Sequence, residues 1–149
     1  MCFSNFKVFP LALSALLLIS LSLVSCQQQP SLLPQLQAKG RITPQNWREK
    51  IIFDYFQAIK AERYEYAYSL LAPKIRGHYA DYVEDLKINH RFLPEAIAIG
   101  EEYPAEYSTY GYLIHYITAG NSNISSGRML LVPRAQQPGN WYIAYSSAI

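Results

Sequence analysis

Apolar residues recur at helical spacing in three consecutive segments in the middle of the chain. The first segment begins at Thr43 and Pro44, a pair typical of an N-cap and a first helical residue. Its apolar positions fall on one side of a helix: Trp47, Ile51, Ile52, Tyr55, Phe56 and Ile59. Two shorter segments repeat this spacing, first Tyr64, Ala67, Tyr68 and Leu71, ended by Pro73, and then Tyr79, Tyr82, Val83 and Leu86. The pattern predicts three amphipathic helices in succession.

After the third helix the period changes to the alternation that is typical of strands. We expect strands over 95–103, between Pro94 and Pro104, and over 107–118, 128–132 and 141–145. The last three strands are separated by predicted turns: Gly120-Asn121-Ser122-Asn123, Ser125-Ser126-Gly127 and residues 136–140. Such short connections favour antiparallel pairing. Helices followed by strands predict an α+β fold, with the helices packed on one face of an antiparallel sheet.

The predicted strand over 107–118 is largely apolar on both of its faces. Alternation assigns its side chains to two sets: Tyr110, Tyr112, Ile114 and Tyr116 on one face, and Leu113, His115 and Ile117 on the other. We therefore expect either that both faces are covered or that one of them meets a partner.

The first 25 residues have the parts of an export signal. Lys7 precedes an almost wholly apolar run over 8–24, shorter than the roughly 20 residues that a membrane-spanning helix needs. Leu23-Val24-Ser25-Cys26 closes this run and resembles the lipobox of bacterial lipoproteins. The resemblance implies that residues 1–25 are removed as a lipoprotein signal peptide and that Cys26 becomes a lipidated N-terminus. The alternatives are an uncleaved membrane anchor and an ordinary secretory signal that ends in cysteine.

Lipidation would determine both location and cysteine chemistry. Two or more acyl chains on Cys26, one of them typically palmitate, would hold the mature chain on a membrane of the bacterial cell envelope, facing the periplasm or the cell exterior. Cys2 would be removed, so no cysteine pair remains for an intramolecular disulfide. Residues 26–42 contain Pro30, Pro34 and Gly40 without a steady period, and we expect them to form a flexible tether before one domain over 43–149.

Charge and aromatic content narrow the candidate partners. Thirteen basic and 11 acidic residues leave a net charge of +2, which makes no electrostatic case for nucleic-acid binding. All 13 tyrosines lie between Tyr55 and Tyr145. They indicate either an aromatic core or an aromatic pocket or interface.

Three phrases of the predicted domain resemble the NTF2-like superfamily: Phe53-Asp54-Tyr55-Phe56-Gln57-Ala58-Ile59-Lys60, then Tyr64-Glu65-Tyr66-Ala67-Tyr68-Ser69-Leu70-Leu71-Ala72-Pro73, and finally Trp141-Tyr142-Ile143. The resemblance implies a cone-shaped fold, in which N-terminal helices pack on a curved antiparallel sheet that wraps around a pocket. The superfamily contains enzymes, ligand binders and interaction modules, so this fold does not determine a function.

The chemistry of the superfamily's enzymes is only partly available to this chain. Its isomerases place a carboxylic acid on the sheet, whereas this chain has no Asp or Glu after Glu106. Dehydratase-type chemistry would use His115 as a base, with Asp54 or Tyr55 of the first helix facing it. His78, His90 and His115 lack the spacing of metal ligands, and no cofactor motif is present in the sequence, so we expect neither a metal nor a cofactor.

Together these observations predict a lipid-anchored, non-enzymatic module that binds another envelope protein or a small apolar ligand through a sheet face or an aromatic pocket. The predicted pocket residues are Tyr55, Tyr82, Tyr112, His115 and Trp141. The alternative is a dehydratase- or isomerase-type enzyme that uses His115 with Tyr55 and other pocket tyrosines. A homodimer through the sheet face of Tyr110, Tyr112 and Tyr116 is a further option.

Overall fold

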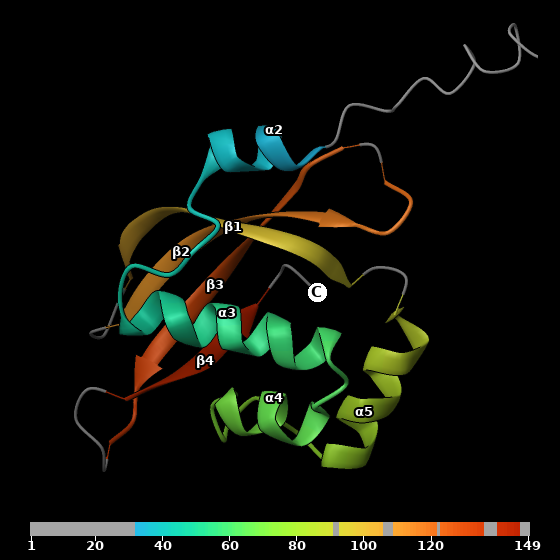
Figure 1. Ribbon diagram of the computed structural model, residues 1–149. Coiled ribbons are helices and arrows are strands. Elements are labelled where there is room, and N and C mark those ends of the chain that lie inside the picture. Colours follow the sequence, from blue (N-terminus) through green and yellow to red (C-terminus); the bar gives the residue numbers. More distant parts are fainter. Residues whose placement is uncertain (1–31, 91–92, 106–108, 122, 136–139, 147–149) are drawn as a thin grey trace, which may run out of the picture. The chain divides into compact units, whose positions relative to one another are not determined.

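A curved antiparallel sheet carries helices on both of its faces (Figure 1). The computed structural model describes residues 32–149 except 91–92, 106–108, 122, 136–139 and 147–149, so the predicted signal peptide and Cys26 lie outside the described residues. The described elements follow one another along the chain as α2 (Leu32–Lys39), α3 (Trp47–Lys60), α4 (Tyr64–Leu70), α5 (Tyr79–Ile88), β1 (Pro94–Ala105), β2 (Thr109–Thr118), β3 (Ser125–Pro133) and β4 (Trp141–Ser146). The predicted α+β class is confirmed.

The sheet has the order β1-β2-β3-β4, and every neighbouring pair is antiparallel. Irregularities in the register fall between Pro94 and Ala96 and between Ile99 and Glu102 on β1, and at Leu130 and Leu131 where β3 pairs with β4. They increase the local twist. Pro94 and Pro104 belong to β1 rather than bracketing it, because an edge strand tolerates residues without an N–H donor. The predicted turn at Ser125-Ser126-Gly127 is wrong, since these residues pair with β2 and begin β3.

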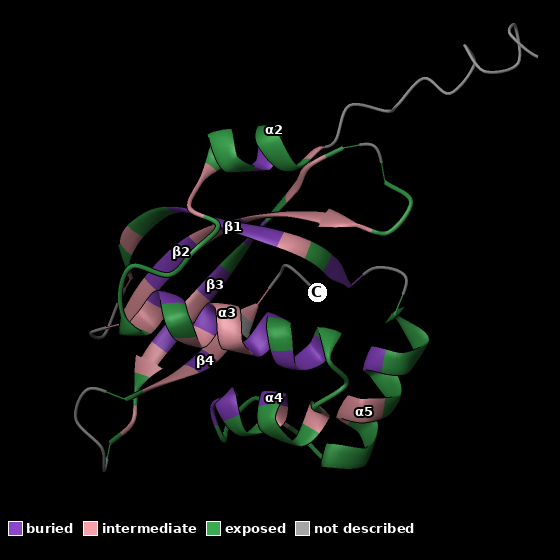
Figure 2. Cartoon of the chain, viewed as in Figure 1, coloured by how far each residue is buried: buried purple, intermediate pink, exposed green. Residues whose placement is uncertain are grey.

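The main core lies between the sheet and α3, α4 and α5. Figure 2 shows buried residues gathered where α3 crosses the strands. The strands contribute six fully buried side chains to this core: Ile99, Tyr112, Ile114, Met129, Leu131 and Ile143. Tyr110 and Tyr116 are partly buried and pack against the same core; a homodimer through this face stays a prediction.

The first helix begins later than the sequence predicts. Asn46, not Thr43, is the N-cap of α3, because its side-chain Oδ1 accepts a hydrogen bond of 3.0 Å from the Glu49 N–H. Trp47 is then the first helical residue and is 74% exposed, so its expected place on the buried stripe is wrong. The second helix ends at Leu70, and Leu71 instead forms a parallel bridge with Ile143 of β4.

The predicted tether over 26–42 is wrong for its described part. Residues 32–39 form α2, which packs against β1 and β2 on the sheet face opposite α3 (Figure 1). Leu36 is fully buried there, although it lies outside the main core. The compact unit therefore begins at Leu32 rather than at residue 43, and helices cover both faces of the sheet rather than one. The expectation that both faces are covered is confirmed where α2 lies.

A tight crossing connects α2 to α3 around the edge of β1. Arg41 and Ile99 exchange two backbone hydrogen bonds of 2.8 Å. At Gly40 the two backbone segments approach so closely that a Cβ would lie 2.4 Å from the Ile99 carbonyl oxygen. Only glycine avoids this clash.

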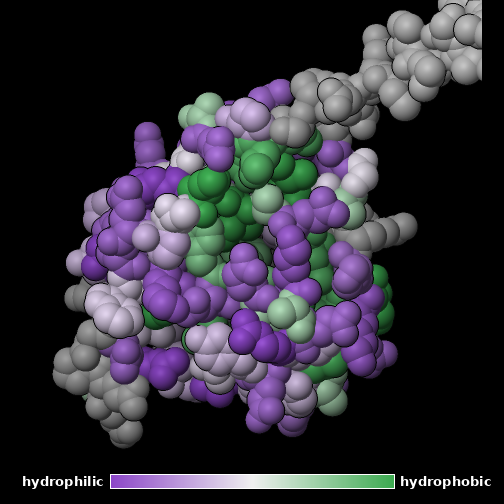
Figure 3. All heavy atoms as spheres, in the orientation of Figure 1, coloured by the Kyte–Doolittle hydropathy of each residue, from purple (hydrophilic) through white to green (hydrophobic). Residues whose placement is uncertain are grey.

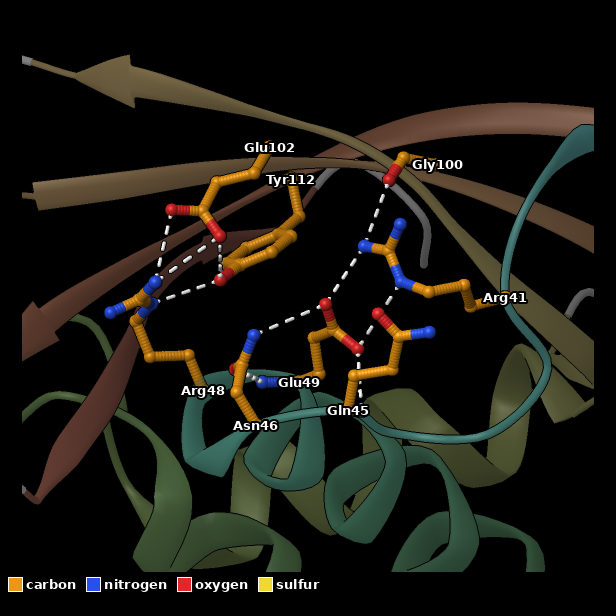
Figure 4. A network of polar contacts seen from close by, with 8 residues as sticks. All are labelled: Arg41, Gln45, Asn46, Arg48, Glu49, Gly100, Glu102 and Tyr112. Carbon is orange, nitrogen blue, oxygen red and sulfur yellow. Dashed lines mark hydrogen bonds and ion pairs between the residues drawn. The ribbon is translucent and has the colours of Figure 1, made fainter.

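The Glu49 carboxylate of α3 binds Arg41 of the segment that connects α2 to α3 (Figure 4). Its side chain is only 2% exposed and accepts hydrogen bonds from Arg41 Nη2 at 2.8 Å, from the Gln45 N–H at 2.8 Å and from Asn46 Nδ2 at 3.2 Å. Arg41 Nη2 also donates to the Gly100 carbonyl at 3.3 Å. A buried charge with this many partners holds α3 at one place along β1.

The packing of α2 leads to a first prediction. Leu36→Ala should lower the free energy of unfolding of the full chain by about 3 kcal/mol, because it removes most of a fully buried side chain and leaves a cavity in its place. Chemical denaturation followed by circular dichroism measures the change. Leu33→Ala on the same helix is the matched control, since Leu33 is 45% exposed. Equal losses from both variants would mean that α2 is not packed on the sheet.

A second prediction concerns the buried carboxylate. Glu49→Gln keeps the side-chain shape but removes the charge that Arg41 faces, and it should lower the free energy of unfolding by about 3 kcal/mol. Lys50→Ala, at the exposed neighbouring position of α3, should change it by no more than about 0.5 kcal/mol. Urea titrations of the two variants give the comparison, and a Glu49→Gln loss as small as that of Lys50→Ala would contradict the assigned role.

Candidate functional site

A pocket of about 610 Å³ opens among α3, α5, β4 and the segment that follows α4. Its apolar walls come from four side chains: Leu71, Ile75, Leu86 and Ile143. Tyr55 of α3 and Tyr82 of α5 also line it. The volume falls within the range of small-molecule sites, and a mostly apolar lining with a few polar groups is typical of them.

The two tyrosines are the pocket's most distinctive chemical groups. The Tyr82 hydroxyl is buried and makes no hydrogen bond of good geometry within the described part of the chain, although the Tyr55 side chain lies near it. Burial raises the pKa of Tyr55 to about 12. Burial, reinforced by the neighbouring Tyr55, also raises the pKa of Tyr82. Both hydroxyls are therefore protonated at neutral pH, and Tyr82 has an unused donor to offer a ligand.

Polar residues at the pocket bias its charge. Asp85, Asn89 and Ser146 line it, and the Asn89 side-chain amide donates to the Asp85 carbonyl at 3.0 Å. The lining residues that the structure describes include a carboxylate but no Lys, Arg or His. An anionic ligand would meet repulsion without a compensating cation, so the pocket favours a neutral or cationic one.

A smaller apolar hollow of about 210 Å³ lies between α2, α3 and the start of β1. Figure 3 shows apolar surface gathered in this region. Leu33, Phe53, Phe56 and Ile97 contribute to its lining, but Lys60 there already donates to the Glu95 carbonyl at 3.0 Å. It has no buried hydroxyl comparable to that of Tyr82, so the larger pocket is the stronger candidate.

The structure brings only two of the five predicted pocket residues together. Tyr55 and Tyr82 share the pocket, whereas Tyr112, Trp141 and His115 lie elsewhere. Trp141 packs edge-on against Tyr110, with ring centroids 5.3 Å apart, and lines a different groove. The sequence could not distinguish these positions, since the facing of a residue depends on strand register and on which helix covers which strand.

Tyr112 belongs to a closed polar triangle at one end of the core (Figure 4). Its hydroxyl accepts from Arg48 Nε at 2.9 Å and donates to Glu102 Oε2 at 2.7 Å, while Arg48 Nη2 lies 3.0 Å from Glu102 Oε1. Burial is the main cause that raises the pKa of Tyr112 to about 12. The Arg48 guanidinium also lies 3.9 Å from the centroid of the Tyr110 ring. All three polar groups are committed to one another.

Glu102 is a carboxylate on the sheet that the sequence reasoning missed. The later strands contain no carboxylate, whereas Glu102 lies within the strand predicted over 95–103. Antiparallel pairing places it opposite Tyr112. Its ion pair with Arg48 gives it a role in packing α3 against the sheet.

His115 lies on the sheet face that α2 approaches, because it alternates with the core residue Ile114. Its Nδ1 is 2.8 Å from Ser126 Oγ, and its Nε2 lies beside Gly100. Partial burial and the charge of Lys39 lower the pKa of His115. The sheet thus separates His115 from Asp54 and Tyr55, and the structure does not assemble the dehydratase-type arrangement.

Two further features of the described residues bear on the site. Within the described ranges no three His, Cys, Asp or Glu side chains gather as metal ligands would. In the same part of the chain, every helix falls short of the length and apolar character that crossing a membrane requires. Comparison with protein-family models, curated proteins and solved structures gives no significant match to this chain.

Proposed function

We propose that this chain is a lipid-anchored protein of the bacterial envelope whose NTF2-like domain binds a small apolar ligand. The α+β architecture, with three helices over one face of a curved sheet, supports the family proposal. The observation that carries the binding function is the unpaired Tyr82 hydroxyl inside the apolar pocket. A buried donor without a partner is costly to the folded protein, and a ligand oxygen would satisfy it.

The pocket's chemistry narrows the ligand class. Leu71, Leu86 and Ile143 offer aliphatic walls, so most of the ligand surface should be hydrocarbon. Tyr82 calls for one hydrogen-bond acceptor, and the Asp85 carboxylate in the lining disfavours a ligand carboxylate. We therefore expect a neutral, largely hydrocarbon compound that carries a hydroxyl or carbonyl oxygen, and a ring compound with one hydroxyl is a simple probe of this class. The described residues that line this pocket assemble no acid–base pair, which is why we propose binding rather than catalysis.

The envelope location rests on the lipobox-like sequence at Cys26. A thioether-linked diacylglycerol would place the binding domain beside a bilayer, where apolar molecules concentrate. A pocket with aliphatic walls and one hydrogen-bonding group suits a ligand that partitions between membrane and water. The two parts of the proposal can be tested separately.

The first test uses 2-naphthol, a neutral ring compound with a single hydroxyl, as the probe. We expect adducts on the full chain in native mass spectrometry, with 2-naphthoate binding more weakly because of its charge. Tyr82→Phe should raise the dissociation constant for 2-naphthol about fivefold, the equivalent of one lost hydrogen bond. It should change the free energy of unfolding little, because Tyr55 is near the hydroxyl but forms no hydrogen bond of good geometry with it.

Tyr79→Phe is the control for this test, since Tyr79 is an exposed tyrosine of the same helix that does not line the pocket. It should leave naphthol binding unchanged. A failure of the wild-type chain to bind naphthol, or equal affinities for the wild type and Tyr82→Phe, would overturn the pocket assignment. The chain purified from its own host should also retain an apolar small molecule in the same spectra.

The second test addresses the lipid. Cys26→Ser should remove the acceptor thiol and release the protein from the membrane fraction, or leave an unprocessed precursor that still contains residues 1–25. Detergent-phase partitioning and the mass of the intact chain distinguish these outcomes. Cys2→Ser is the matched control and should behave like the wild type. Full lipidation of the Cys26→Ser variant would refute the lipobox interpretation.

A further inference from the structure

A second groove, of about 390 Å³, lies along α3 and is separate from the tyrosine pocket. Three aromatic side chains line it: Trp47 at the start of α3, Tyr66 of α4 and Trp141 of β4. Lys50, Asp54 and Arg134 contribute charged groups to the same groove. The tyrosine pocket and this groove have no lining residue in common among those described.

The apolar surface exposed in this groove is aromatic rather than aliphatic. Trp47 is 74% exposed and Tyr66 is 42% exposed. The aliphatic lining residues, Ile51 and Leu70, are partly or fully buried in the core instead. Removing the exposed Trp47 indole from water is favourable, so a ligand that covers it would gain binding free energy.

The charged groups of the groove are held in place. Asp54 accepts from Lys50 Nζ at 2.6 Å and from the Tyr66 hydroxyl at 3.4 Å. Arg134 Nε donates to the Trp141 carbonyl at 3.3 Å, and its guanidinium lies 4.1 Å from the centroid of the Tyr142 ring. A carboxylate has four acceptor sites and a guanidinium five donors, so both retain capacity for a ligand's hydroxyl groups.

We propose that this groove binds a short saccharide. The C–H face of a sugar ring is weakly positive and stacks on the negative face of an aromatic ring, which Trp47, Tyr66 and Trp141 supply. The equatorial hydroxyls around the ring then reach Asp54 and Arg134. An apolar peptide would call for exposed aliphatic side chains, and a nucleic acid for more cations than Lys50 and Arg134 provide.

The chain carries its own reporter for this site. It has two tryptophans, Trp47 and Trp141, and both line the groove. The full chain is kept in a detergent without a sugar head group and titrated with two sugars, the tetramer of β-1,4-linked N-acetylglucosamine and maltotetraose. At least one of them should give a saturable change in tryptophan fluorescence. Neither tetramer should compete with 2-naphthol, because the two sites are separate.

Trp47→Ala is the decisive variant, because a side chain this exposed contributes little to folding and Trp141 remains as the reporter. It should raise the dissociation constant for the sugar about tenfold, as expected for the loss of one stacking contact. Tyr79→Ala, an exposed aromatic residue outside the groove, should leave that constant unchanged. Unchanged affinity in Trp47→Ala, or no fluorescence change with either tetramer at millimolar concentration, would overturn the proposal.

Discussion

The buried carboxylate of Glu49 is the constraint on which the arrangement of this domain depends. It accepts hydrogen bonds from a side chain before α3, from a backbone amide and from the helix's own N-cap residue. Because Arg41 is also bridged to Ile99, the carboxylate couples the edge of the sheet to the first turn of α3. The crossing from one sheet face to the other is therefore made at one position, where Gly40 allows the backbones to touch.

The position of α3 determines both candidate binding sites. The side of the helix that faces the core carries Tyr55 into the tyrosine pocket. Trp47 at the start of the helix and Asp54 at its middle line the second groove. Between them, Arg48 holds the helix to the sheet through Glu102 and Tyr112. Polar contacts near the beginning of one helix thus set the distance and orientation of the side chains that line both candidate sites.

The sheet separates His115 from the tyrosine pocket, although His115 is next in sequence to a core residue. His115 follows the core residue Ile114 directly, yet alternation turns it to the face of α2, next to Lys39 and Ser126. The tyrosine pocket is left with neutral hydroxyls, aliphatic walls and one carboxylate. Burial raises the pKa of both tyrosines, and the only histidine on the described strands lies on the sheet's other face.

The sequence alone determined the α+β class, three of the four described helices and the approximate positions of the strands, because hydrophobic periodicity is a local property. It also singled out Tyr55 and Tyr82, which lie on apolar helical stripes. It did not reveal α2, whose eight residues bury one leucine only because a sheet face lies beneath them. The Glu49 cap, the pairing of Glu102 with Tyr112 and the separation of His115 from the pocket depend on register and on helix placement. Contacts between residues far apart in the sequence decide those features, so only the tertiary structure could show them.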